Sequence, residues 1–94
     1  MRELRAVFVM VPALLAEMIL RAVAARGVTL VVAARAPADV VILGPGAAPG
    51  RAAGAPVLAL SEDFSRLLGP GPEDDVAFTA DALAGRLREI AEAI

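Results

Sequence analysis

The sequence predicts a small α/β domain built on a parallel sheet, and two observations carry this prediction. Several short runs of β-branched and other apolar residues have almost no polar interruption, which is typical of strands buried on both faces of a parallel sheet. These runs alternate with stretches in which apolar residues recur at helical spacing, and strand–helix–strand order favours parallel strands joined by right-handed crossovers. The 94 residues suffice for one such domain, which we expect to span residues 1–94.

Five segments are predicted as strands. They are residues 5–11, 28–34, 39–43, 57–60 and 76–78, and most of them consist almost entirely of Val, Leu, Ile, Phe, Met and Ala. We expect the strand order 2-1-3-4-5, which places the two predicted long helices on the same face of the sheet.

Residues 13–26 are predicted as the first of these helices. Pro12 fits its first turn and Gly27 is a good stop signal. Glu17 and Arg21 are four residues apart and mark a solvent-facing stripe. The apolar band of this helix is wider than one contact with a sheet requires, so it offers a possible interaction surface. The residues of the band are Leu14, Leu15, Met18, Ile19, Leu20 and Val23.

Two further helices are predicted after the fourth strand. A short one opens at residues 61–63, where Ser61 provides an N-cap hydroxyl and two acids occupy the first turn. The last helix covers residues 80–93, with Thr79 as its N-cap. Its sheet-facing stripe consists of Leu83, Leu87, Ile90 and Ile94.

Two connections are unsuited to forming helices that cover the sheet. Residues 35–38 leave no room for a helix, and residues 44–56 contain four Gly and three Pro. One face of the sheet is therefore thinly covered, and large exposed apolar patches mark contacts between molecules. We expect a homodimer or contact with another protein partner. In the alternative, the second connection seals this face through Ala47, Ala48, Ala52 and Ala53.

The residue types that are absent exclude several chemistries. The chain has no Cys, His or Lys, and all nine basic residues are Arg. Without Cys or His we expect neither a typical zinc site nor a thiol or imidazole nucleophile, and without Lys no P-loop lysine. We therefore expect no cofactor, no metal and no enzymatic activity. The net charge of −2 provides no basic field for direct nucleic-acid binding.

The N-terminal apolar run, residues 6–16, is similar to the central part of a secretion signal. Glu3 falls in the region that is basic in such signals, Pro12 interrupts the run, and Glu17 follows before the run is long enough to cross a bilayer. We interpret this segment as a core strand and its helix, and expect a cytoplasmic protein with no membrane contact.

Four segments carry a resemblance to a known family: residues 5–17, 37–43 and 57–61, and the chain from Ala80 onwards. Together they resemble the receiver domains of bacterial response regulators, most closely those that precede a LuxR-type helix-turn-helix. The resemblance covers nearly the whole chain. It implies a flavodoxin-like parallel sheet with reduced helices on one face, and a role in signal transduction and the regulation of transcription.

The positions that carry a receiver's chemistry hold other residues in this sequence. The family has two Mg²⁺-binding acids where this chain has Val11 and Pro12, and a phosphorylated aspartate where it has Gly44. The family's lysine after the fifth strand is matched by Thr79, whereas Ser61 matches the family's switch hydroxyl. The resemblance thus implies a pseudo-receiver with a degenerate phosphoacceptor position at Gly44 and switch-like hydroxyls at Ser61 and Thr79.

Two functions follow as hypotheses. The first is a non-catalytic signalling or dimerisation module. The alternative is a module that binds a small anion or nucleotide at the carboxyl edge of the sheet, where such folds bind ligands. The glycine-rich segment 44–50 resembles a phosphate loop, although its two prolines remove backbone donors. The residues of this possible ligand edge are Arg35, Gly46, Arg51, Glu62 and Asp63.

Overall fold

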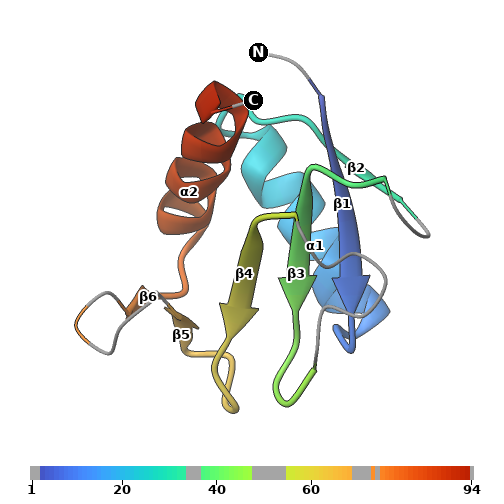
Figure 1. The fold of residues 1–94 in the computed structure, drawn as a ribbon. Coiled ribbons are helices and arrows are strands. Elements are labelled where there is room, and N and C mark those ends of the chain that lie inside the picture. Colours follow the sequence, from blue (N-terminus) through green and yellow to red (C-terminus); the bar gives the residue numbers. More distant parts are fainter. Residues whose placement is uncertain (1–2, 34–36, 48–54, 69–72, 74, 94) are drawn as a thin grey trace.

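A computed structural model describes residues 3–33, 37–47, 55–68, 73 and 75–93. Within these residues the chain forms one six-stranded sheet and two helices, and both helices lie on the same face of the sheet (Figure 1). The α/β class and the placement of the two helices on one face are therefore confirmed.

The first four strands are parallel and the last two are antiparallel to their neighbours. The sheet order is β2-β1-β3-β4-β5-β6, with β5 antiparallel to both β4 and β6. The strands are β1 (Leu4–Val9), β2 (Leu30–Val32), β3 (Val40–Leu43), β4 (Val57–Leu60), β5 (Arg66–Leu68) and β6 (Val76–Ala77). The prediction of a purely parallel five-stranded sheet was wrong at the edge formed by β5 and β6, because the described chain makes a hairpin after β4.

The short helix predicted at Ser61 is replaced by a tight turn and the strand β5. The Ser61 N–H donates to the Arg66 carbonyl at 3.0 Å, which closes the hairpin between β4 and β5. Leu67 then pairs beside Leu60 and is fully buried. A one-turn helix would leave Leu67 without this place in the sheet, and burial of a leucine stabilises by about 1.5–3 kcal/mol. The expected fifth strand, residues 76–78, is found as β6.

Helix α1 (Ala13–Ala24) ends as its sequence predicts. Gly27 has a positive φ of 82°, and its N–H donates to the Ala24 carbonyl at 3.1 Å. The Val28 N–H donates to the Val23 carbonyl at 3.0 Å, which completes a Schellman motif. At the other end, Pro12 occupies the N-cap position, one residue before the first turn in which it was expected.

Helix α2 (Ala80–Ala93) begins at the predicted cap. The Ala82 N–H donates to the Thr79 hydroxyl oxygen at 3.1 Å. Leu83 and Leu87 are buried and Ile90 packs against the core, so the described part of the predicted stripe is confirmed. Ile94 lies outside the described residues.

Alternating residues of the strands form two separate apolar clusters. The larger one lies between the sheet and the helices and includes Ile42 and Leu87. The smaller one lies on the opposite face, where Val41 and Leu43 are buried and Ala47 and Ala55 pack against them. Ala47 and Ala55 therefore cover part of this face within one copy, whereas Val57, which pairs beside Val41, remains 42% exposed, so a second copy on this face stays a prediction. Ala48, Ala52 and Ala53 lie outside the described residues.

Candidate interaction surface

A groove lies between α1 and the start of α2. It encloses about 170 Å³ and is lined mainly by apolar side chains. The residues that line it are Leu15, Met18, Ile19, Ala22, Phe78, Thr79, Ala80 and Leu83. We refer to it as the interhelical groove.

Two large apolar side chains of α1 point into solvent near this groove. Leu14 is 70% exposed and Met18 is 58% exposed, and the two are one helical turn apart. The sheet-facing stripe of the same helix, Ile19 and Val23, is buried. The wide apolar band predicted for residues 13–26 is therefore divided between the core and the surface, and its exposed part is the strongest interaction feature of the described helices.

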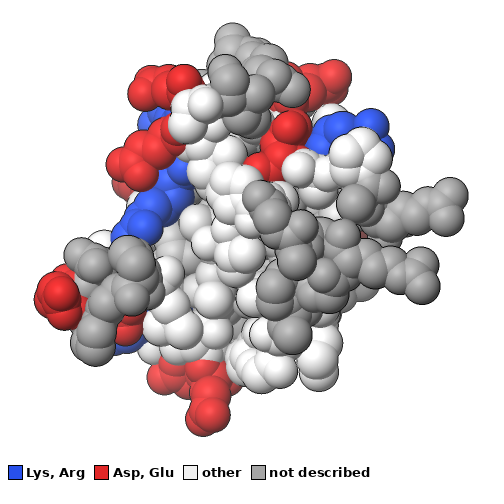
Figure 2. Space-filling view, viewed as in Figure 1, with Lys and Arg blue, Asp and Glu red and all other residues white. Residues whose placement is uncertain are grey.

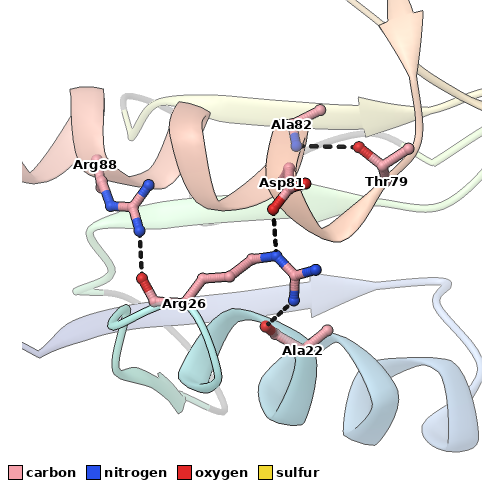
Figure 3. A network of polar contacts seen from close by, with 6 residues as sticks. All are labelled: Ala22, Arg26, Thr79, Asp81, Ala82 and Arg88. Atoms are coloured by element: carbon pink, nitrogen blue, oxygen red, sulfur yellow. Dashed lines mark hydrogen bonds and ion pairs between the residues drawn. The ribbon is translucent and has the colours of Figure 1, made fainter.

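A polar network joins the two helices that form the walls of the groove (Figure 3). The Arg26 guanidinium donates from Nε to the Asp81 carboxylate and from Nη1 to the Ala22 carbonyl, the latter at 3.0 Å. Arg88 of α2 donates to the Arg26 carbonyl. Arg26 and Asp81 are far apart in the sequence, so no local pattern predicts their contact. The network connects the C-terminal end of α1 to the first turn of α2 through Asp81 and to the interior of α2 through Arg88.

Charged side chains of α1 complete this surface. Glu17 and Arg21 are exposed, and neither side chain has a hydrogen-bond or ion-pair partner among the described residues. In the view of the sheet side of the molecule, uncharged residues occupy the middle, and charged residues lie at the left, lower and upper edges (Figure 2). We define the α1 surface as Leu14, Glu17, Met18 and Arg21 together with the interhelical groove.

The carboxyl edge of the sheet brings Gly44 directly against the end of β1. The Gly44 N–H donates to the Val9 carbonyl at 2.8 Å. A Cβ atom at position 44 would lie 1.9 Å from the carbonyl oxygen of Met10, whose own φ is positive at 55°. The position at which the resemblance to receivers would place a phosphoacceptor is therefore closed to any side chain as long as this backbone holds its place.

Ser61 and Asp63 belong to the β4–β5 turn and serve its geometry. The Asp63 Oδ1 atom accepts hydrogen bonds from the Ser61 hydroxyl at 2.9 Å, the Ser65 hydroxyl at 2.6 Å and the Ser65 N–H at 3.0 Å. These donors stabilise the carboxylate and lower the pKa of Asp63 to about 2, with Ser65 contributing most. Ser61 and Thr79, the two expected switch hydroxyls, thus hold a turn and a helix cap.

The residues of the predicted ligand edge do not come together into a described site. Arg35 and Arg51 lie outside the described residues. Gly46 has a positive φ of 74°, Glu62 is exposed, and Asp63 is engaged in its own turn. The described part of the chain contains no group of three or more acidic residues arranged to hold a metal ion. Anion binding at this edge remains a prediction from the sequence.

The helices do not have the length and hydropathy needed to cross a bilayer within the described residues. Comparisons of the chain with protein-family models, with curated proteins and with solved structures each found no match.

The Asp63 carboxylate makes the stability of the hairpin sensitive to acid. Because the folded-state pKa is about 2 and the usual value is about 3.9, the carboxylate contributes stability above about pH 4 and loses it as the pH falls towards 2. We expect the melting temperature of the wild type to fall more steeply than that of Asp63→Asn between pH 4 and pH 2. The control Glu62→Gln should keep the wild-type slope, and parallel curves for wild type and Asp63→Asn would contradict the assignment.

Proposed function

We propose that this chain is a non-catalytic protein-interaction module, resembling a response-regulator receiver that has lost its phosphoacceptor site. Its partner-binding surface is the α1 surface. The observation that carries the proposal is the exposure of Leu14 and Met18 beside the interhelical groove. Exposed large apolar residues next to an apolar groove with ordered walls are typical of protein-binding surfaces.

The carboxyl edge of the sheet supports a non-catalytic role. The position that matches the receiver's aspartate is Gly44, and its contact with the Met10 carbonyl leaves no space for a nucleophile. Val11 and Pro12 stand where the resemblance would place the acids that hold Mg²⁺. Phosphoryl transfer to a carboxylate requires both a nucleophile and charge neutralisation of the phosphate, and these residues provide neither.

A photo-crosslinking residue at the α1 surface tests this proposal. Leu14 is replaced by p-benzoylphenylalanine in the cells that produce the chain, with Val57 as the matched control because it is 42% exposed but lies on β4, away from the groove. We expect light-dependent adducts with protein from position 14 and far fewer from position 57. Equal labelling from both positions, or none from position 14, would reject the α1 surface as a binding site.

A further inference from the structure

We propose that the α1 surface binds a second copy of this chain, with the two α1 helices antiparallel across a two-fold axis. This inference rests on the proposed function and names its partner. A two-fold interface places the same patch of each copy against itself, so the patch must be complementary to its own rotated image. The charges and the sizes of the residues on α1 meet this requirement.

The charged residues Glu17 and Arg21 make the surface complementary to its own rotated image. Glu17 and Arg21 are four residues apart, exposed, and without polar partners among the described residues. In an antiparallel pair whose axis passes midway between them, Glu17 of each copy lies opposite Arg21 of the other. Two reciprocal ion pairs form, and each satisfies groups that are otherwise free. A parallel pairing in register would place like charges together, which disfavours association.

The sizes of the side chains also fit this antiparallel register. Leu14 is then opposite Ala24 of the second copy, and Ala24 is exposed and small. Met18 lies close to the two-fold axis at the border of the interhelical groove, where its flexible thioether fills an irregular space. Large residues therefore meet small ones or a groove, which lets two helices approach closely.

Sedimentation equilibrium between about 1 and 100 µM tests the proposal with a charge exchange. The wild type is expected to show a dimer of the 9.6 kDa chain. Glu17→Arg and Arg21→Glu should each weaken the dimer by about tenfold or more, because each places like charges in contact. The double variant Glu17→Arg/Arg21→Glu should recover most of the wild-type affinity. Met18→Glu should abolish the dimer.

Val31→Glu is the matched control, because Val31 is 41% exposed but lies on the edge strand β2. It should leave the dimer unchanged. Circular dichroism should show that every variant is folded, since all substituted residues are exposed. A 9.6 kDa species at every concentration would overturn the proposal, as would a double variant no better than the single ones. If position 14 crosslinks to a different protein while the chain sediments as a monomer, the interaction module stands and the homodimer does not.

Discussion

Replacing Leu87 by alanine is expected to lower the free energy of unfolding by about 2–5 kcal/mol. Leu87 is completely inaccessible to solvent and belongs to the cluster between the helices and the sheet. The substitution removes buried methyl groups and leaves a cavity that the neighbouring residues fill only in part. A domain of this size has a total stability of about 5–15 kcal/mol, so the loss is a large share of it.

Urea denaturation of the wild type, Leu87→Ala and Leu14→Ala measures this effect. Leu14→Ala makes the same chemical change on a helix, but at a residue that is 70% exposed, so its effect should stay within about 0.5 kcal/mol when measured at protein concentrations below those at which the chain dimerises. A loss below about 0.5 kcal/mol for Leu87→Ala would show that α2 does not pack on the sheet through this face.

Gly44→Ala is expected to destabilise the domain by about 1–3 kcal/mol or more, which is large for the addition of one methyl group. The added Cβ would lie 1.9 Å from the carbonyl oxygen of Met10, so the ends of β1 and β3 must move apart. Gly85→Ala is the matched control, because no atom apart from its chain neighbours and the adjacent backbone of α2 lies within 4 Å of its Cβ position. It should stabilise the domain by about 0.5–1 kcal/mol, as expected for a glycine inside a helix.

The same contact predicts that one substitution cannot create the phosphoacceptor that the resemblance to receivers would place at position 44. Gly44→Asp meets the same Met10 carbonyl and in addition brings a carboxylate to a buried position. After treatment with acetyl phosphate and Mg²⁺, mass spectrometry should find no phosphoryl adduct on the wild type or on Gly44→Asp. A labile adduct of 80 Da, about the mass of one phosphoryl group, on either protein would contradict this prediction.

The local sequence correctly predicted the strands and helix ends that are marked by apolar runs, a capping residue or a glycine stop. The nearly uninterrupted apolar runs of β1, β3 and β4 identify strands of the sheet. The Thr79 cap and the Gly27 stop define helix ends, and the structure contains all of these elements. These signals depend on residues within a few positions of each other. Of the predicted strand 28–34, the structure contains Leu30–Val32 as β2. Leu30 pairs beside Leu4, the first residue of β1, so residues 28 and 29 precede the start of β1, and residue 34 lies outside the described residues.

The hairpin after β4 was missed because its turn has the same local chemistry as a helix start. A serine followed by two acids caps a helix N-terminus and equally well builds a turn around Asp63. The choice between them depends on Leu67, which pairs with β4 and β6 and in this place joins the core cluster between the sheet and the helices. Similarly, the sequence identified the wide apolar band of α1, but the exposure of Leu14 and Met18 depends on how α1 packs on the sheet and beside α2.

The two helices that cover one face of the sheet come from opposite ends of the sequence, α1 near its start and α2 near its end. About 70 residues separate the end of α1 from the end of α2, and synthesis at about 5–20 residues per second takes roughly 3–14 s to pass through them. In the later part of this interval the growing chain carries most of its strands without the helix that contributes Leu83 and Leu87 to their cover. We therefore expect ribosome-bound chains that stop before Ala80 to bind chaperones for hydrophobic segments, and chains that include all of α2 to be released from them.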